Sequence, residues 1–410
     1  MDLTCNSCAD SLYALNLSCK AFVAMSIKFY TSIFLLSIIL WSCGNPSVGK
    51  PKAVPTVAAL PKEIKTPLNN PNTAEKVQLG KLLFYDPILS GGKDISCVSC
   101  HHPATGYAEF LDLSIGSNGK GLGSKRVFNT PNTIPLMKRN SPTILNTAYN
   151  GIQEKGDYDP EAAAMFWDDR IKSLEKQALE PIKTLEEMRG HHFDKNQILT
   201  EVAVRLEAIP EYKKRFAAAF GSHEPIDSIH IAKAIAAFER TLVANNSRFD
   251  QYMSGDSTAI SLAEKEGLAL FKSVGCINCH SGPMFSDYKL HVIGVPENKK
   301  VLVPDSGAEE RFAFRTPSLR NLRFTAPYMH NGVFQNLKEV LEFYEDISVG
   351  KTRNESVSKA MFDPLVDDLE LSVKEMSLLV SFLNTLNNDN FDKEIPLTVP
   401  SGLAVGGNIH

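Results

Sequence analysis

The sequence predicts a mainly α-helical protein built from two related modules that are joined by long loops. Apolar residues recur at helical spacing in several segments, whereas sustained alternation of apolar and polar residues is scarce. A weak internal repeat places GKLLF (80–84) before the motif CVSCH and GLALF (267–271) before the motif CINCH. Gly- and Pro-rich stretches, notably 114–142 and 281–328, separate the helical segments. The repeat therefore indicates two modules of the same kind.

The composition excludes several classes of protein. The 410 residues are 43% hydrophobic and 22% charged, which is typical of a soluble globular chain. At about 100–200 residues per domain, this length suggests two or three domains. The formal net charge is −4, so no large basic field is available and we expect no nucleic-acid partner. Only one strongly apolar stretch exists, which excludes a multispan membrane protein.

That apolar stretch covers residues 29–41 and predicts an exported protein. Its 13 residues are too few to span a bilayer but suit the apolar region of a signal peptide. The residues that follow resemble a bacterial lipoprotein box with Cys43 as the lipidated residue. Trp41 is unusual inside such a box, so export without lipid remains the alternative. Met25 offers a more normal start than Met1.

The domain organisation follows from these features. A composition rich in Pro, Ser, Lys and Ala after Cys43 indicates a tether, and the repeat places a boundary near 245–260. The predicted segments are a signal or lipoprotein segment (1–43, of which 1–24 reflects an over-extended start), a tether (44–65), two domains (66–250 and 251–395) and a tail (396–410).

Helices are predicted from their end signals and periodicity. Asp159 and Pro160 are typical of a helix start, and the predicted helix over 160–180 stops at Pro181. Further helices are predicted over 196–220 with a break near Pro210, over 229–245 and over 371–386.

Two C-x-x-C-H motifs carry the chemistry, because this spacing lets two thiols bind the two vinyl groups of one porphyrin while the adjacent His ligates its iron. The motifs comprise Cys97, Cys100 and His101, and Cys276, Cys279 and His280. A four-Cys zinc site would have its halves about 15–20 residues apart, whereas these lie 179 residues apart. A thioredoxin-type motif would need a βαβ context, which is missing. We therefore expect two covalently bound c-type haems, whose attachment outside the cytoplasm agrees with export.

Beyond these motifs, the sequence resembles the bacterial di-haem cytochrome c peroxidase family, including its MauG-like branch. The matching segments occur in the family's order and are LGKLLFYDPILS (79–90), SCVSCHHPATGYAE (96–109), KRNSPTILN (138–146), FWDDR (166–170), LEEM (185–188), FRTPSLRN (314–321) and TAPYMHNGVF (325–334). The resemblance implies two cytochrome c-like haem domains, with a peroxide-reacting haem in the N-terminal domain and an electron-receiving haem in the C-terminal domain.

The resemblance also implies roles for individual residues. His101 and His280 would be the iron ligands on one side of each haem, and Glu187 would be the acid–base group at the first haem. Trp167 would carry electrons between the haems. The alternatives are a solvated helix-end carboxylate for Glu187 and core packing for Trp167. Arg315 would pair with haem propionates, or form a surface salt bridge.

The chain departs from the reductively activated peroxidases at the first haem. Those enzymes place a His after a Ser-Ile-Gly segment, and here Ser117 stands at that position. The first haem is therefore expected to be open without prior reduction. His191 and His192 are candidate substitute ligands, although surface histidines are the simpler interpretation.

A second departure concerns the other haem. The position where the activated peroxidases supply a Met holds Tyr344, as in MauG-like proteins. A phenolate favours ferric iron. Met329 and Met361 are the alternative ligands, and packing is a further interpretation of Tyr344.

The family also holds Ca²⁺ between its domains, which implies the Asn140 side chain and the carbonyls of Thr325 and Pro327 as ligands. The resulting expectation is a periplasmic peroxidase that reduces hydrogen peroxide to water with electrons from a small cytochrome c or cupredoxin. A membrane anchor through lipid and a homodimer are further expectations. The alternatives are a MauG-like oxidase acting on a protein side chain and a non-catalytic di-haem electron-transfer cytochrome.

Overall fold

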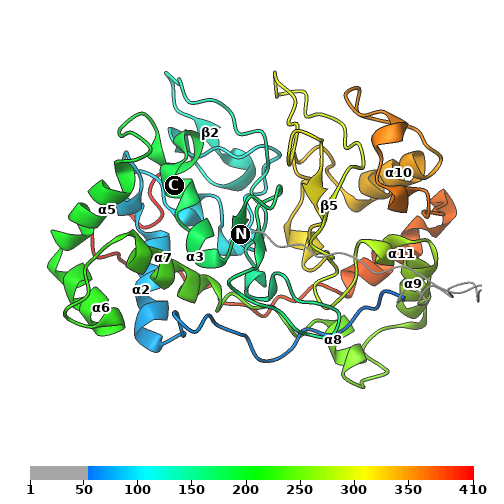
Figure 1. Ribbon diagram of the computed structural model, residues 1–410, viewed down its shortest axis with the longest axis horizontal. Coiled ribbons are helices and arrows are strands. Elements are labelled where there is room, and N and C mark those ends of the chain that lie inside the picture. Colours follow the sequence, from blue (N-terminus) through cyan, green and yellow to red (C-terminus); the bar gives the residue numbers. More distant parts are fainter. Residues whose placement is uncertain (1–53) are drawn as a thin grey trace, which may run out of the picture. The chain divides into compact units, whose positions relative to one another are not determined.

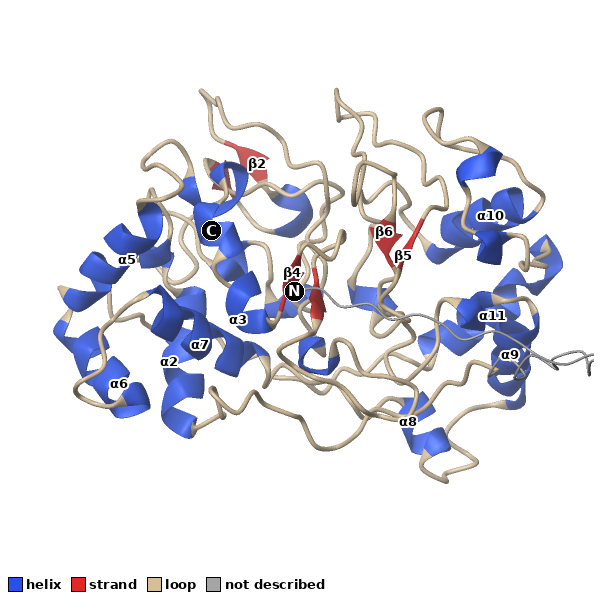
Figure 2. Cartoon of the chain, in the orientation of Figure 1, coloured by secondary structure: helices blue, strands red, loops and turns tan. Residues whose placement is uncertain are grey.

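The computed structural model describes residues 54–410, which form a mainly helical structure with little sheet (Figures 1 and 2). The helices are α2 (Ala74–Tyr85), α3 (Leu174–Gln177), α4 (Glu180–Lys183), α5 (Ile198–Glu207), α6 (Pro210–Phe220), α7 (Ser228–Glu239), α8 (Arg248–Met253), α9 (Leu262–Ser273), α10 (Leu337–Ser348) and α11 (Met376–Asn384). Three antiparallel pairs join β1 (Gly119–Lys120) to β2 (Val127–Phe128), β3 (Ala164–Met165) to β4 (Ile171–Lys172), and β5 (Leu290–His291) to β6 (Phe314–Arg315). The predicted signal segment (1–43), the over-extended start and residues 44–53 of the tether lie outside the described residues.

The first half of the chain is built on the contact between α2 and α7, which lie against each other in Figure 1. Helix α2 begins after Thr73, whose side chain accepts a hydrogen bond from the Lys76 amide. Gly80 lies at the crossing, where a Cβ atom would be 1.9 Å from the carbonyl oxygen of Ala234. Only glycine therefore permits this close helix approach.

The second half repeats this arrangement with α9 and α11. Helix α9 begins with a capping box formed by Ser261 and Glu264. A Cβ atom on Gly267 would be 2.2 Å from the carbonyl oxygen of Leu378. The two glycines of the repeated sequence thus occupy equivalent helix crossings. The core of this half includes the packed rings of Phe249, Phe271, Phe285 and Phe382.

The two ends of the described chain pack on opposite halves. The Thr56 carbonyl accepts a hydrogen bond from the Gly282 amide in the second half (2.7 Å), and Val57 belongs to that half's core. Residues 57–65, which the sequence assigns to a tether, are therefore in contact with the folded part. The predicted tail returns to the first half, where the Gly406 amide donates to the Tyr85 carbonyl (2.9 Å).

The predicted helix over 160–180 is wrong. This stretch contains the β3–β4 hairpin and only the short helix α3. Phe166 and Asp169 take positive φ values of 62° and 53°, which a helix cannot contain. Pro181 lies in the first turn of α4 rather than at a helix stop. Helix propensity is a weak preference, and the tertiary contacts of this hairpin outweigh it.

The other predicted helices are observed, although two of them are shorter than predicted. The helix over 196–220 is observed as α5 and α6, which meet at Pro210 as predicted. The helix predicted over 229–245 is observed as α7 and ends already at Glu239, and the one predicted over 371–386 is observed as α11 and begins only at Met376. Within residues 54–410, no helix combines the length and the apolar character needed to cross a bilayer.

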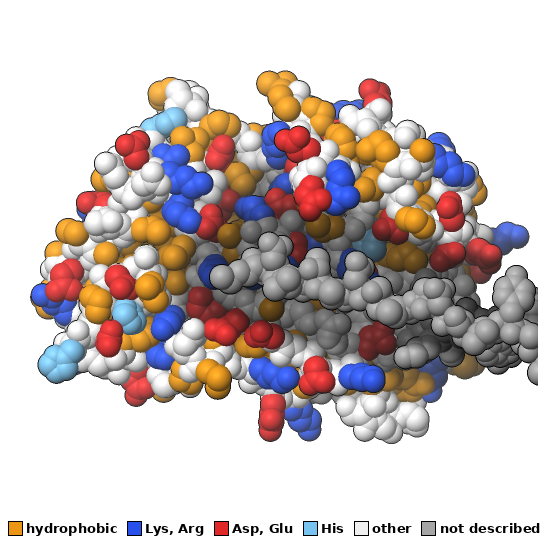
Figure 3. Space-filling view, viewed as in Figure 1, with side chains coloured by type: hydrophobic (Ala, Val, Ile, Leu, Met, Phe, Trp, Pro, Cys, Tyr) orange, Lys and Arg blue, Asp and Glu red, His pale blue; other side chains and the backbone are white. Residues whose placement is uncertain are grey.

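The surface carries both signs of charge. On the face drawn in Figure 3, Lys and Arg side chains are interspersed with Asp and Glu side chains. The exposed large apolar side chains, such as Leu68, Leu302 and Leu397, are far apart in the sequence.

The equivalent helix crossings predict the effect of a single methyl group. We expect Gly80→Ala and Gly267→Ala each to lower the free energy of unfolding of the holoprotein by about 1–3 kcal/mol, because the added carbon meets a backbone oxygen of the facing helix. Chemical denaturation followed by circular dichroism measures this. Glu266→Ala, at an exposed neighbouring position of α9, is the control. A glycine variant as stable as this control would contradict the close crossing.

Candidate functional site

Each C-x-x-C-H motif folds as a tight turn. Residues Cys97–Ser99 and Cys276–Asn278 form single 3₁₀ turns. The amides of His101 and His280 donate to the carbonyls of Cys97 and Cys276, at 3.0 Å and 2.9 Å. None of the four motif cysteines is in a disulfide within the described part of the chain, so all four are available for attachment to a porphyrin. The turn thus presents both thiols and the imidazole of each motif together.

The two histidine rings are held in the same way. The Nδ1 atom of His101 lies 3.0 Å from the carbonyl oxygen of Tyr107, and that of His280 lies 2.9 Å from the carbonyl oxygen of Phe285. Tyr107 and Phe285 both have positive φ values, of 55° and 53°. When Nδ1 donates to a carbonyl, Nε2 keeps its lone pair for a metal.

Burial keeps both rings neutral. It lowers the pKa of His101 to about 4, and it also lowers the pKa of His280. A neutral imidazole is the form that ligates iron. The local structure of both motifs therefore fits haem attachment and ligation.

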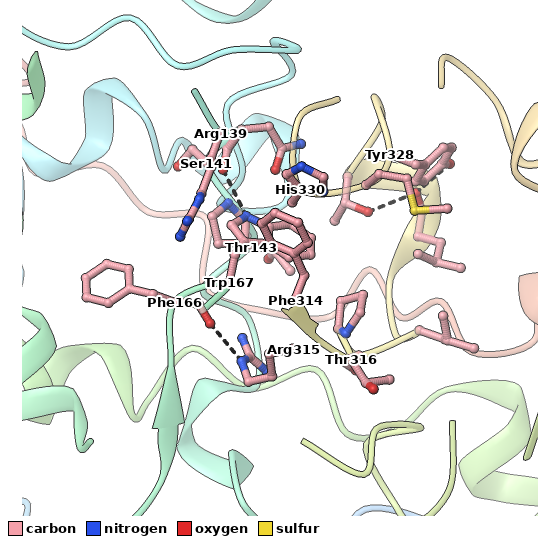
Figure 4. A pocket seen from close by; sticks show the side chains of 18 of the residues that line it. Arg139, Ser141, Thr143, Phe166, Trp167, Phe314, Arg315, Thr316, Tyr328 and His330 are labelled. Atoms are coloured by element: carbon pink, nitrogen blue, oxygen red, sulfur yellow. Dashed lines mark hydrogen bonds between the residues drawn. The ribbon is translucent and has the colours of Figure 1, made fainter. Parts of the chain in front are cut away.

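A cavity connects the two motifs and is walled by both halves of the chain (Figure 4). Its lining includes Cys97, Cys100, His101, Asn140, Trp167, Glu187, Cys276, Cys279, His280, Arg315, Thr325, Pro327 and Tyr344. The structure thus brings together the residues for which the resemblance implies a catalytic, haem-binding or calcium-binding role. Much of the remaining wall is aliphatic, with Ile95, Leu145, Met188, Leu341 and Leu383 as examples. An apolar wall around thiols and neutral imidazoles suits a porphyrin.

Glu187 faces this cavity from a turn of π-helix, Leu185–Arg189. Burial raises the pKa of Glu187 to about 7, Arg170 acts in the opposite direction, and the carboxylates of Glu186 and Glu180 raise it further. Such a carboxyl group can both accept and donate a proton near neutral pH. The geometry therefore differs from that of a solvated helix-end carboxylate.

The loop that contains Ser117 supports the backbone of this turn. The Ser117 amide donates to the Glu186 carbonyl (3.0 Å), and its hydroxyl donates to the Glu187 carbonyl (3.2 Å). A Cβ atom on Gly116 would be 2.3 Å from both carbonyl oxygens, so glycine is needed for this approach. The buried Arg126 holds the loop by donating to three of its carbonyls. The Ser117 side chain is thus occupied with the turn and does not line the cavity.

The candidate substitute ligands are not in the cavity wall. His191 and His192 are exposed, which agrees with surface histidines. Met361 is also exposed and lies outside the lining, whereas Met329 is part of it.

Trp167 is held by both halves of the chain (Figure 4). Its indole Nε1 donates to the Asn140 carbonyl (3.2 Å), and its own carbonyl accepts from the Arg315 amide (2.7 Å). The Arg315 guanidinium also donates to the Phe166 carbonyl (2.8 Å), and burial lowers the pKa of Arg315. Arg315 is therefore not in a surface salt bridge.

Tyr344 reaches the cavity from α10 in the second half. Burial raises the pKa of its phenol, and negative charge on the Cys279 and Cys276 sulfurs would raise it further. The free phenol is therefore neutral, and it would ionise only with a strong positive partner such as ferric iron.

The proposed calcium ligands also lie together. The Asn140 side-chain amide donates to the Pro327 carbonyl (2.9 Å), and the Thr325 residue lines the same cavity. The buried Asn140 Oδ1 has no hydrogen-bond partner. Among the described residues, no group of three or more His, Cys, Asp or Glu side chains could hold a metal ion. A cation at this place would depend on amide and carbonyl oxygens.

Several polar residues of the cavity wall were not predicted as site residues, and two of them stand out. Gln177 of α3 and Glu239 of α7 both line the cavity, and each has a buried side-chain oxygen without a hydrogen-bond partner. Glu239 follows the apolar run IAAF in a predicted helix, and this pattern indicates a carboxyl group on the buried face of that helix. Gln177 gave no such signal, because it falls in the mispredicted helix.

Comparisons with known proteins agree with this arrangement. A family model described as di-haem cytochrome c peroxidase matches residues 74–258. The methylamine utilization protein MauG of Methylorubrum extorquens is 38% identical over 331 residues, covering 80% of this chain and 82% of that protein. The cytochrome c551 peroxidase of Nitrosomonas europaea is 33% identical, covering 81% and 85%.

A solved structure of a MauG-like protein associated with microbial copper homeostasis is 27% identical, covers 84% of this chain and 96% of its own, and superposes with a TM-score of 0.63. The diheme peroxidase BthA of Burkholderia thailandensis has the same fold, with 21% identity, coverage of 86% and 99%, and a TM-score of 0.59. These similarities confirm the resemblance seen in the sequence. The protein belongs to the di-haem cytochrome c peroxidase family and is an oxidoreductase with two c-type haems.

Proposed function

We propose that the protein is a peroxidase that reduces hydrogen peroxide to water with electrons from a small external donor protein, a cytochrome c or a cupredoxin. The observation that carries this proposal is the carboxyl group of Glu187, which faces the cavity of the first motif with its pKa raised to about 7. In this proposal the two halves are two cytochrome c-like haem domains, with peroxide reacting in the first.

A haem held by Cys97, Cys100 and His101 would supply the oxidising centre for peroxide cleavage. Glu187 takes a proton from hydrogen peroxide and returns it to the oxygen that leaves as water. Its raised pKa suits both transfers, because neither form is strongly disfavoured at neutral pH. His101 holds its ring by Nδ1 and offers Nε2 as the iron ligand.

Trp167 is the proposed electron relay between the two motifs. Its indole is bonded to the first half and its carbonyl to the second, so it lies where the halves meet. Arg315 positions this residue through the backbone of the hairpin. The unpartnered oxygen of Asn140 supports a Ca²⁺ or water site beside it.

The second candidate function is a MauG-like oxidase that acts on a protein side chain. Tyr344 in the cavity wall and Ser117 at the loop favour it, and two relatives are named as MauG. A di-haem electron-transfer cytochrome without peroxide chemistry is the third candidate. The proposed location is the periplasmic side of the cell envelope, reached by the segment 1–43 and retained there through lipid on Cys43.

The role of Glu187 has a direct test. We expect Glu187→Gln to lower peroxide turnover by about 10²–10⁴-fold, because the amide neither accepts nor returns the proton. In the parent protein, kcat/KM for peroxide should rise as pH increases through about 7, where Glu187 loses its proton, and the variant should lose this rise.

Steady-state kinetics from pH 5 to 9 measure both effects. Glu186→Gln, at the adjacent position of the same turn, is the matched control for turnover, and its pH profile should move to lower pH because Glu186 raises the pKa of Glu187. Unchanged turnover in the Glu187 variant, with both haem spectra intact, would remove Glu187 from the reaction.

Tyr344 as an iron ligand of the second haem is tested by spectroscopy. We expect Tyr344→Phe to change the electron paramagnetic resonance spectrum of one haem in the oxidised holoprotein and to leave the other unchanged. Tyr328→Phe is the control, because Tyr328 lines the same cavity but its hydroxyl donates to the Leu322 carbonyl (2.9 Å). Identical spectra for the parent and Tyr344→Phe would exclude the ligand role.

The position of Ser117 predicts that no reductive activation is required. The oxidised protein should react with peroxide without prior reduction, because Ser117 brings no imidazole to the first motif and its hydroxyl donates to the Glu187 carbonyl. Stopped-flow absorption measures the rate, with protein that has first been reduced as the comparison. Oxidised parent protein that is inert until reduced would refute an open first haem.

A further inference from the structure

A second carboxyl group faces the cavity on the side of the first motif. Glu239, in the last turn of α7, is 4% exposed, and its buried Oε2 has no hydrogen-bond partner among the described residues. Ile235 lines the cavity one turn earlier, so the two side chains share the same face of α7. The Glu239 carboxyl group therefore faces the cavity and is not bonded to a cation within residues 54–410.

The neighbouring charges leave Glu239 without a dedicated cation. Arg240, the next residue on the same helix, forms an ion pair with Glu175 of α3 at 2.6 Å. Burial raises the pKa of Glu239 to about 8, Arg240 lowers it and Glu175 raises it. The two buried cations on α2 and α5, which pack against α7, are engaged elsewhere: Lys76 with the Asn70 side chain and the Pro71 carbonyl, and Arg205 with Glu201.

Glu239 is electrostatically linked to the first motif. Burial raises the pKa of the Cys97 thiol, negative charge on Glu239 raises it further, and charge on Glu187 does so more weakly. Cys97, Glu187 and Glu239 all line the cavity. A charge on Glu239 therefore acts electrostatically on the haem that Cys97 would attach.

We propose that Glu239 is a redox-linked proton site of the first haem. When the haem iron accepts one electron from the donor protein, the Glu239 carboxylate takes up one proton from solvent, and it releases that proton when the electron leaves. The uptake offsets the added negative charge inside an apolar cavity, where an unpaired charge is costly. This inference rests on the proposed function only in requiring a haem at the first motif.

The test is the midpoint potential of the first haem as a function of pH, measured by spectroelectrochemistry on the holoprotein. A Glu187→Gln background removes the other carboxyl group that the first half contributes to the cavity lining. In that background the potential should fall as pH rises through the ionisation of Glu239, since the carboxylate favours the ferric state. Adding Glu239→Gln should make the potential independent of pH over that range. If the potential of the double variant, Glu187→Gln with Glu239→Gln, still falls with pH as it does in Glu187→Gln alone, the proposal is overturned.

Two further variants complete the test. Glu175→Gln removes a nearby carboxylate outside the cavity lining and should preserve the fall but move it to lower pH, because Arg240 loses its partner and Glu175 no longer raises the pKa of Glu239. Glu239→Asp keeps a titratable group, so the potential should still fall, but at a different pH. This variant also provides a test if Glu239→Gln does not load its haems. If Glu239→Asp leaves the pH of the fall unchanged, the proposal is wrong.

Peroxide turnover separates this inference from the proposed function. If the parent protein turns over peroxide and Glu239→Gln leaves the fall in potential intact, the inference fails and the peroxidase stands. If Glu239→Gln removes the fall but the parent protein does not turn over peroxide, the peroxidase fails and the redox-linked proton site stands.

Discussion

One hydrogen bond in each half, from a histidine Nδ1 to a main-chain carbonyl, determines how this chain can hold its two haems. The carbonyls belong to Tyr107 and Phe285, whose positive φ values turn them toward His101 and His280. Such a conformation costs about 1–3 kcal/mol for a residue other than glycine and persists only where packing enforces it. Both aromatic side chains are fully buried, so each core maintains the strain that orients its histidine.

Beyond these shared turns, the two halves differ in what faces the cavity. The first half contributes two carboxyl groups with raised pKa values, Glu187 and Glu239. The second half contributes the phenol of Tyr344 from α10. In the proposed function this difference separates proton handling at one haem from electron storage at the other. Identical attachment motifs therefore do not imply identical chemistry, because the opposite wall supplies the reactive groups.

The sequence predicted those parts of the protein that depend on local patterns. The two C-x-x-C-H motifs predicted the haem sites, and the repeated Gly80 and Gly267 segments predicted two similar modules, whose helix crossings the structure explains. Glu239 was not predicted as a site residue, because the cavity it faces is formed by segments distant in sequence. The sequence also could not predict that the Tyr107 and Phe285 carbonyls bond the two histidines, because every residue has a main-chain carbonyl and its type does not show which one will accept.

The mispredicted helix over 160–180 shows why local patterns fail at the place where the halves meet. As a helix, this segment would bond its amides and carbonyls within itself. The Trp167 and Phe166 carbonyls instead accept hydrogen bonds from Arg315 of β6, and the Trp167 indole reaches Asn140. The positive φ values of Phe166 and Asp169 allow this hairpin to face both halves together. A helix would have satisfied the local preference of the segment and left the second half without its bonds to Trp167, so the contact between halves decides the local structure.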